Sequence, residues 1–323
     1  MIIDLPKSTK AKLIGDPHIG LKFEVGVPMH RRGERERSQF AKLVAALNTE
    51  GVEYNITVGD LFEHPFVSHS VVVRTAEAYL HAADTHPNTT YVVLAGNHDR
   101  PRTVGTLCAW ESFREIVVDR LDNLFVIETP EVWDDFVFFP WEWDVGAEEQ
   151  ALRLIEEFIP AEYPEYRIAV GHWDLKSFGG HDEHLCPTKI LKKGFGVGGI
   201  YSGHYHTPGE YVVDGVAVYC TGSLEPYSHG EDPGAEIYVT APLKEVQANP
   251  ERFTDKCVRV ILAPGEEVPI DLDCLAVTAL RTQGESIEVP EIQMDGFDWD
   301  KVLKNELAQV DDAEVVAFIK DRL

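Results

Sequence analysis

The chain has 323 residues, of which 44% are hydrophobic, and it carries a formal net charge of −26. This length suits one large α/β domain with a smaller one beside it. No apolar run approaches the ~20 residues that a membrane-spanning helix needs, which excludes a membrane protein of that kind. An acidic surface repels polyanions at long range and counts against DNA as a substrate, unless bound metal ions, a partner subunit or high salt offset the charge.

The N-terminal sequence and the cysteines indicate the compartment. The first residues lack the basic and then apolar layout of a signal peptide. The five cysteines lie far apart and form no CxxC pair. Reduced, buried thiols are therefore expected, and not a disulfide framework or a thiolate zinc site. We predict a cytoplasmic protein.

Hydrophobic periodicity predicts a βαβαβ series at the start of the chain. Strands are expected at residues 11–15, 52–58 and 90–95, with a helix ending within 29–48 and another over about 69–83. This alternation is typical of a layered α/β fold.

A strand-rich half follows, in which the Asp214-Gly215 pair between two β-rich runs predicts a hairpin. The expected strands cover residues 124–127, 136–139, 166–171, 198–202, 210–213, 216–220 and 236–240. The predicted architecture is an α/β sandwich of two sheets that face each other, with helices outside.

The composition changes after about residue 243, where a connection leads to strands expected at 257–262 and 273–279. An acidic, proline-broken stretch and two short amphipathic helices are expected to end the chain. We predict a catalytic domain over residues 1–243. Residues 244–323 are predicted to form a small acidic appendage that caps this domain or docks a partner.

Five short clusters combine a glycine with side chains that bind divalent metals. They are GDPH with Asp16 and His18, GDLFE with Asp60, GNHD with Asn97 and His98, GHW with His172, and GHYH with His204 and His206. Four of the clusters follow an apolar run of strand character. The strands are therefore expected to bring these side chains to one rim of a sheet.

These residue types suit a two-metal phosphoesterase. Two cations ~3.5–4 Å apart can activate a water molecule and neutralise a phosphate, and a carboxylate is the natural bridge between them. In Asp16-x-His18 and His204-x-His206, both side chains share one face of an extended segment, so one metal ion can take both or two ions one each. Mixed histidine, carboxylate and amide ligands suit Mn²⁺, Fe²⁺ or Zn²⁺ better than Mg²⁺ or Ca²⁺, and Mg²⁺ stays possible.

His98 is the candidate proton donor or transition-state stabiliser, because a tight turn would point it away from its neighbour Asn97. Asp99 is the candidate to orient the His98 ring.

Substrate contacts are predicted at five positions on weaker grounds. His64 lies close in sequence to Asp60. Arg31 and Arg32 belong to a basic segment that could grip phosphates, or could equally form a solvated helix face paired with glutamates. Lys192 and Lys193 belong to a glycine-containing stretch between the last two clusters, which is expected to be a mobile substrate loop.

The order D-x-H, GD-x-x-(D/E), GNHD, GH and GHxH resembles that of the calcineurin-like metallophosphoesterase superfamily. Over roughly residues 10–240, the chain is most similar to SbcD-type nuclease subunits of recombination endonucleases, including phage-encoded ones. The segments GDLFEH, GHWDLKSFGG, YSGHYHTPG and YCTGSLEPYSHGED carry this finer resemblance.

The resemblance implies the metallophosphoesterase fold and hydrolysis of DNA, as an exonuclease or endonuclease, in repair and recombination. It implies that one metal ion is held by Asp16, His18 and His206, the other by Asn97, His172 and His204, with Asp60 as the bridge and His98 assisting the leaving group. It further implies two divalent ions with Mn²⁺ favoured, an SbcC-like ATPase partner, a possible homodimer, and the host cytoplasm for a phage-encoded chain.

The sequence leaves two other functions open. Its net charge favours a phosphodiesterase or phosphatase for a nucleotide or small molecule, although the protein-phosphatase branch typically shows GDxVDRG and GNHE in place of GDLFEH and GNHD. A non-enzymatic assembly subunit is the third reading, and the complete set of ligand positions argues against it. Glu63 stands where the family usually has Asp and is not expected to be a ligand.

Overall fold

The structure of the chain is a computed structural model. It describes residues 1–5, 9–103, 107–133, 135–157, 167–175, 183–268 and 272–282. One compact unit comprises Met1–Leu262 and Glu267–Leu280, and a second comprises Ala263–Glu266 and Arg281–Leu323. The two helices predicted at the C-terminal end lie outside the described residues.

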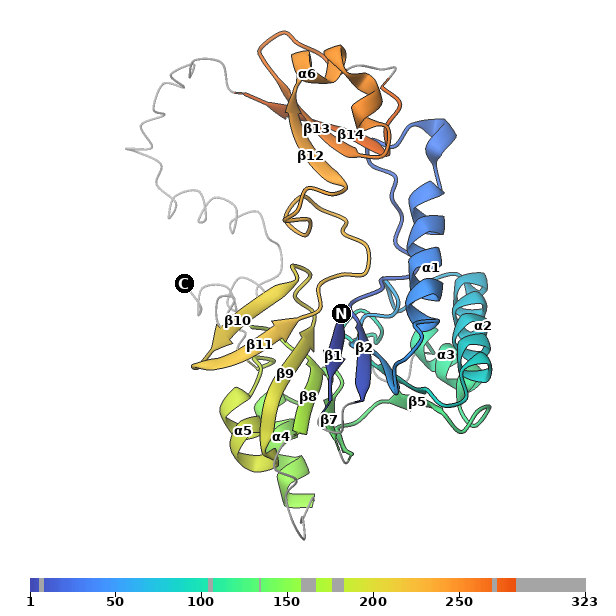
Figure 1. The fold of residues 1–323 in the computed structure, drawn as a ribbon, viewed down its shortest axis with the longest axis vertical. Coiled ribbons are helices and arrows are strands. Elements are labelled where there is room, and N and C mark those ends of the chain that lie inside the picture. Colours follow the sequence, from blue (N-terminus) through green and yellow to red (C-terminus); the bar gives the residue numbers. More distant parts are fainter. Residues whose placement is uncertain are drawn as a thin grey trace, which may run out of the picture. The chain divides into compact units, whose positions relative to one another are not determined.

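The first sheet has five strands in the order β1-β2-β3-β4-β5 (Figure 1). They are β1 (Ile2–Asp4), β2 (Lys10–Ile14), β3 (Tyr54–Thr57), β4 (Thr90–Leu94) and β5 (Leu124–Ile127). Strands β2 to β5 run parallel, and β1 pairs antiparallel with β2 at the edge. Parallel strands covered on both faces read as continuous apolar runs, as YVVL in β4 does.

Three helices cover one face of this sheet: α1 (Glu34–Leu47), α2 (His69–Thr85) and α3 (Ala109–Val117). A short 3₁₀ helix, η1 (Met29–Arg31), precedes α1. The apolar stripes of the three helices are buried together with side chains of β4 in one core cluster. The helical spacing of their apolar residues is therefore explained by this shared core.

The second sheet has six strands in the order β10-β11-β9-β8-β7-β6. They are β6 (Glu131–Val132), β7 (Phe136–Phe139), β8 (Arg167–His172), β9 (Val197–Gly203), β10 (Gly209–Val213) and β11 (Val216–Cys220). Its four central strands are parallel, and the predicted hairpin at Asp214-Gly215 joins β10 to β11. Helices α4 (Ala147–Glu157) and α5 (Thr188–Phe195) share a core cluster with this sheet.

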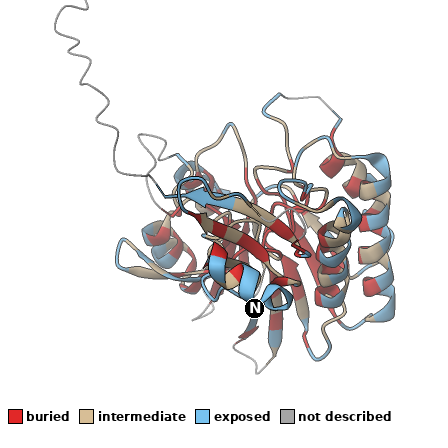
Figure 2. Ribbon diagram, turned by 90° about the horizontal axis from the view of Figure 1, so that it is seen from above, coloured by how far each residue is buried: buried red, intermediate tan, exposed pale blue. Residues whose placement is uncertain are grey.

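The two sheets face each other across a third core cluster. Leu13, Ile56 and Val92 enter it from the first sheet, and Phe138 and Val170 from the second. In Figure 2 the strands are largely buried, whereas the helices keep exposed outer faces. The predicted two-sheet α/β sandwich flanked by helices is confirmed.

A separate three-stranded sheet has its own small core. It consists of β12 (Tyr238–Pro242), β13 (Cys257–Leu262) and β14 (Ala276–Arg281), with α6 (Leu243–Ala248) and the 3₁₀ helix η2 (Pro250–Phe253) between β12 and β13. The predicted boundary after residue 243 falls at the start of α6, and the division into domains there stays a prediction. Among the described residues, none of the helices is both long and apolar enough to cross a bilayer.

Candidate metal centre

The seven predicted ligands lie at the carboxyl ends of five parallel strands. Asp16 and His18 follow β2, Asp60 follows β3, Asn97 follows β4, His172 ends β8, and His204 and His206 follow β9. The backbone N–H of His18 donates to the carbonyl of Asp60 at 2.9 Å, which ties the first two loops together. The two sheets therefore bring their ligands to one rim.

The glycines of the motifs let the ligands approach each other. A Cβ atom on Gly59 would lie 2.2 Å from Nδ1 of His172, and one on Gly96 would lie 2.1 Å from Oδ1 of Asp60. Both distances are too short for any side chain. The predicted ligand His204 and the predicted bridging residue Asp60 also have positive φ angles of 70° and 48°. Strained backbone of this kind, at a cost of order 1–3 kcal/mol per residue, persists where the surroundings fix it and is typical of functional sites.

Among the described residues, three groups of side chains could hold a cation, and two of them share Asp60. The third consists of His18, Glu63 and His98, so Glu63, which was not expected to be a ligand, also lies at ligand distance of His18. Of the two groups that share Asp60, the first consists of Asp16, His18, Asp60 and His206 and the second of Asp60, His172 and His204, with the ligand atoms in each within 4.8 Å of one another. The Oδ2 atom of Asp60 is 3.7 Å from Nε2 of His18 and 3.2 Å from Nε2 of His172. Asp60 therefore stands where a bridging carboxylate between two cations is needed.

Asn97 joins the second group. Its Oδ1 atom lies 3.0 Å from Nε2 of His172 and 2.8 Å from Nδ1 of His204. A neutral amide oxygen adds a ligand without adding charge.

Each histidine has one ring nitrogen occupied outside the cluster. Nδ1 of His172 donates to the Val58 carbonyl at 2.9 Å, and Nε2 of His204 donates to Oδ1 of Asp174 at 2.7 Å. The other nitrogen of each ring then keeps its lone pair for the cluster. Outer partners of this kind fix the tautomer that a metal ligand needs.

In the first group, an oxygen also lies near Nδ1 of each histidine. Nδ1 of His18 lies 2.9 Å from Oε2 of Glu63, and Nδ1 of His206 lies 2.6 Å from the hydroxyl of Tyr227. Glu231 holds the segment that carries Tyr227, because it accepts the Tyr227 backbone N–H at 3.2 Å. Its Oε1 atom also lies 3.7 Å from Nδ1 of His206.

Several buried oxygens in the cluster make no hydrogen bond in the described part of the chain, although histidine nitrogens lie 3.2 to 4.0 Å from them. Both oxygens of Asp16 and Oδ2 of Asp60 are buried and make no hydrogen bond within the described residues. A buried carboxylate oxygen without a partner is costly, and a divalent cation would satisfy it. The residues present therefore fit two divalent cations, with oxygen and imidazole donors that suit Mn²⁺, Fe²⁺ or Zn²⁺.

The pKa shifts in the cluster also fit the binding of cations. Burial opposes a charge on His172, but Asp60 and Asp16 outweigh it and raise the pKa of His172 to about 9. Burial alone would also raise the pKa of Asp60, yet His172 and His18 hold that pKa well below its usual range. Without a cation, protons on the imidazoles balance the buried carboxylates, and a metal ion would take over that balance.

His98 adjoins the cluster but is bonded away from it. Its ring makes an edge contact with the His18 ring at a centroid distance of 4.8 Å. Its backbone N–H donates to Oδ1 of Asp60 at 2.8 Å, and Nδ1 donates to the Glu63 carbonyl at 2.7 Å. Nε2 of His98 is therefore the nitrogen left for a substrate atom.

The prediction that Asp99 orients the His98 ring is wrong. Asp99 is fully buried, and its carboxylate accepts the backbone N–H groups of Leu61, Phe62 and Gly96 at 3.2, 2.8 and 2.8 Å. Both oxygens are used in tying two ligand loops together, and the Glu63 carbonyl holds the ring instead.

Three residues around the cluster were not predicted: Asp174, Tyr227 and Glu231. Asp174 follows the GHW motif directly, which was an available signal. Tyr227 and Glu231 stand in the segment YCTGSLEPYSHGED, whose sequence shows no periodicity that would point to His206.

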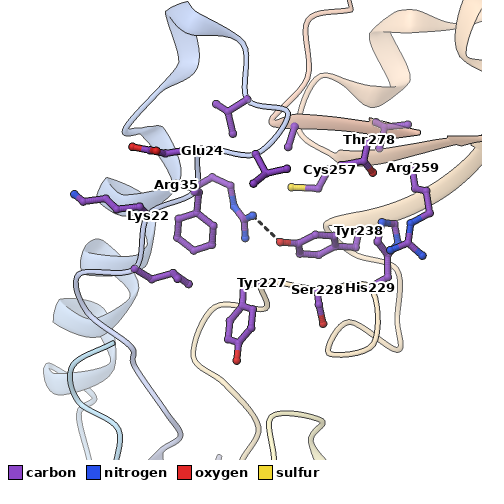
Figure 3. A pocket seen from close by; sticks show the side chains of 16 residues that line it. Lys22, Glu24, Arg35, Tyr227, Ser228, His229, Tyr238, Cys257, Arg259 and Thr278 are labelled. Atoms are coloured by element: carbon purple, nitrogen blue, oxygen red, sulfur yellow. Dashed lines mark hydrogen bonds between the residues drawn. The ribbon is translucent and has the colours of Figure 1, made fainter. Parts of the chain in front are cut away.

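Arg35, from the basic segment after the first motif, has a structural role. It is 5% exposed and donates to the Tyr238 hydroxyl at 2.7 Å, to Glu225 at 3.1 Å and to the Pro226 carbonyl at 2.6 Å. Arg35, Tyr238 and Tyr227 line one cavity of about 350 Å³. Figure 3 shows the hydrogen bond between Arg35 and Tyr238 in it. Arg35 thus ties α1 to the segment that presents Tyr227.

Arg31 and Arg32, the substrate contacts predicted near the first motif, differ in their partners and exposure. Arg31 is engaged by Glu34 at 2.7 Å, by the Thr254 carbonyl and by Asp273 at 3.6 Å, none of them part of the cluster. Arg32 is exposed.

The other three predicted contacts also differ in position. His64 is exposed and lines a hollow together with Asn97 and His98. Lys192 and Lys193 are exposed on α5. The stretch between the last two motifs contains α5 and β9 and is not a long loop, although residues 176–182 of it lie outside the described part.

Residues 9–208 match the family model of the calcineurin-like phosphoesterases. The chain belongs to this family. Calcineurin-like phosphoesterases are metal-dependent hydrolases, and the shared cluster at Asp60 could hold the metal ions. No curated protein matches this calcineurin-like phosphoesterase.

Three solved structures resemble the chain. TT1561 of Thermus thermophilus has a TM-score of 0.41 and 14% identity, covering 66% of this chain and 89% of its own. The phosphopantetheinyl hydrolase PptH from Mycobacterium tuberculosis has a TM-score of 0.35 and 13% identity, covering 68% and 93%. The nuclease MPE of Pseudomonas putida has a TM-score of 0.31 and 16% identity, covering 71% and 93%.

Proposed function

We propose that this protein is a metal-dependent nuclease that hydrolyses phosphodiester bonds of DNA in repair and recombination. The observation that carries the proposal is the position of His98, which contacts the His18 ring and leaves Nε2 open at the edge of a surface hollow. A proton donor beside a two-cation cluster is what departure of an alkoxide from phosphorus requires.

Two divalent cations, when bound, would supply an activated water and neutralise the phosphate. The chain's own groups complete the reaction. His98 is fixed through Nδ1, so its protonated form carries the transferable proton on Nε2. That proton passes to the departing oxygen as the bond from this oxygen to phosphorus breaks and the bond from the water oxygen forms. The His98 backbone N–H donates to Asp60, and this bond fixes the position of His98 relative to the cluster.

The choice of DNA is supported by sequence similarity. GDLFEH, GHWDLKSFGG and YCTGSLEPYSHGED resemble segments of SbcD-type nucleases. On this proposal the protein acts in the cytoplasm, or in the host cytoplasm if it is phage-encoded. It acts as a monomer or a homodimer, and its partner is an SbcC-like ATPase. The partner would supply DNA affinity that a chain with a net charge of −26 lacks at long range.

A nucleotide or small-molecule phosphodiesterase is the second candidate. The net charge of −26 favours it, because a small anion screened by two cations meets less repulsion than a polyanion does.

Cleavage of labelled single-stranded and duplex DNA with Mn²⁺, with and without an SbcC-like ATPase, tests the proposal. Cyclic nucleotides and bis-p-nitrophenyl phosphate are assayed alongside. The expected result is DNA cleavage that His98→Ala abolishes. The exposed His81 on α2 provides the matched control, because His81→Ala should leave cleavage unchanged. Hydrolysis of the small diesters with no DNA cleavage under any condition would favour the second candidate.

A further inference from the structure

A hollow of about 310 Å³ opens to solvent beside the metal centre. Asn97 and His98 line it, so it adjoins the side of the cluster from which a leaving group would depart. The remaining wall comes from the segment after the GDLFE motif, the segment after GNHD, and Trp143. A substrate group attached to the scissile phosphate on this side would lie along the hollow.

The charge of the hollow differs from that of the chain as a whole. Among the described residues that line it there is no carboxylate, although the net charge of the chain is −26. Arg100 is paired with Glu128 at 3.0 Å. Arg102 is exposed and has no ion pair within the described part of the chain, although it also lines a neighbouring hollow with Glu111, Glu142 and Asp144. Its guanidinium can therefore turn to an anion in either hollow.

Two aromatic side chains accompany this cation. Phe66 is 56% exposed, and its ring lies 5.7 Å from that of His64. Trp143 is held in place by donating Nε1–H to the Arg100 carbonyl at 2.9 Å, and the Arg102 guanidinium lies 4.5 Å from the centre of its ring. The cation is thus positioned in advance by a fixed indole.

We propose that this hollow binds the nucleotide next to the scissile phosphate, with its base stacked on Phe66 and its backbone phosphate on Arg102. Exposed aromatic faces combined with an unpaired arginine are how proteins hold single-stranded nucleic acid without reading its sequence. The inference rests on the proposed nuclease function and narrows it, because it assigns a single-stranded nucleotide segment to the leaving-group side.

Binding of a fluorescein-labelled phosphorothioate oligothymidylate to the full chain with Mn²⁺ tests this inference. Fluorescence anisotropy gives the dissociation constant for Phe66→Ala and Arg102→Gln. The matched controls are Phe125→Ala on β5 and Arg120→Gln after α3, both exposed and neither part of the hollow. Thermal melting checks that each variant is folded.

Phe66→Ala should weaken binding by about 5- to 150-fold, the range for loss of one stacked base. Arg102→Gln should weaken binding and lower the slope of log affinity against log salt by about one. Both controls should bind as the wild type does.

Three outcomes would overturn the inference. Unchanged binding in both variants, with DNA still cleaved by the wild type, removes this subsite and leaves the nuclease function intact. A loss in Arg102→Gln with none in Phe66→Ala means that charge alone accounts for binding. A wild type that neither binds nor cleaves DNA refutes the inference together with the proposed function.

Discussion

The Nε2 atoms of His18 and His206 face each other at 3.0 Å, although the two residues are 188 positions apart. Nδ1 of His18 lies 2.9 Å from Oε2 of Glu63, and Nδ1 of His206 lies 2.6 Å from the Tyr227 hydroxyl. In the tautomers that carry the proton on Nδ1, both Nε2 lone pairs point into the same space. Two lone pairs at this distance repel unless a proton or a cation lies between them. The arrangement of His18 and His206 therefore suits a metal ion between the two rings.

Substitutions at His98 and Asp60 should separate chemistry from metal binding. His98→Ala removes the proposed proton donor and should lower kcat by about 10²- to 10⁴-fold while metal content stays at the wild-type level. Asp60→Ala removes the shared oxygen and should lower both activity and metal content. Turnover of bis-p-nitrophenyl phosphate and elemental analysis measure the two effects. A loss of metal in His98→Ala would assign His98 to the ligands instead.

Tyr227→Phe should loosen the hold on His206. The variant loses the oxygen that lies 2.6 Å from Nδ1 of this ring, so the tautomer with a free Nε2 is less favoured. Metal affinity should fall by about 10- to 100-fold, as found for outer partners of metal-binding histidines. Titration with Mn²⁺ followed by electron paramagnetic resonance measures it. Tyr219→Phe, a half-buried tyrosine on β11, should titrate as the wild type does.

Metal affinity should rise with pH between about 6 and 9. Without metal, the neighbouring carboxylates raise the pKa of His172 to about 9, and the pKa of His18 is also raised despite its burial. Because a metal ion binds neutral imidazole, each raised pKa makes protons compete with the metal below that pH. Calorimetry in buffers of different ionisation enthalpy should show proton release at pH 7. Binding without proton release would contradict the charge balance described here.

Asp232→Asn should destabilise the fold in a pH-dependent way. Asp232 accepts the backbone N–H groups of Glu236, Ile237 and Tyr238 at 3.0, 2.6 and 2.7 Å. Burial would raise its pKa, but these bonds to the charged form outweigh burial and hold the pKa below the ordinary 3.8. The stabilisation is therefore fully present above pH 3.8 and is lost as pH falls through the folded pKa.

Urea unfolding measures this effect. At pH 7 Asp232→Asn should cost about 1–3 kcal/mol of unfolding free energy, and the difference from the wild type should shrink below pH 3.8. Asp214→Asn, in an exposed turn, should change the free energy little at either pH. An equal loss of unfolding free energy for Asp232→Asn at both pH values would contradict this, because it would show that the hydrogen bonds do not depend on the charge of Asp232.

Sequence periodicity predicted most strands, because buried parallel strands are apolar throughout. The strands at 124–127, 136–139 and 216–220 were predicted with the bounds of β5, β7 and β11. Helix α5 was read as a loop because of its glycines. Gly194 lies against Ile155 of α4, where a Cβ atom would come within 2.3 Å of the isoleucine side chain. That glycine serves packing between helices, which one segment of sequence cannot show.

In the candidate site, the sequence predicted the ligands but not the residues that orient them. The ligand motifs were visible because each follows its own strand, and parallel strands bring their carboxyl ends to one rim. The groups that orient the ligands come from tertiary contacts, as with Tyr227 on His206. The role predicted for Asp99 was wrong because sequence adjacency does not show where a side chain points. Asp99 follows His98 directly, but the turn directs its carboxylate to the backbone N–H groups of Leu61 and Phe62.

The most direct test of the account is anomalous scattering from crystals of the Mn²⁺-loaded protein. The account predicts two peaks ~3.5–4 Å apart, with Asp60 in contact with both, Asp16 and His206 on one side and His172 and His204 on the other. A single peak at saturating Mn²⁺, or two peaks with Asp60 bound to neither, would contradict it.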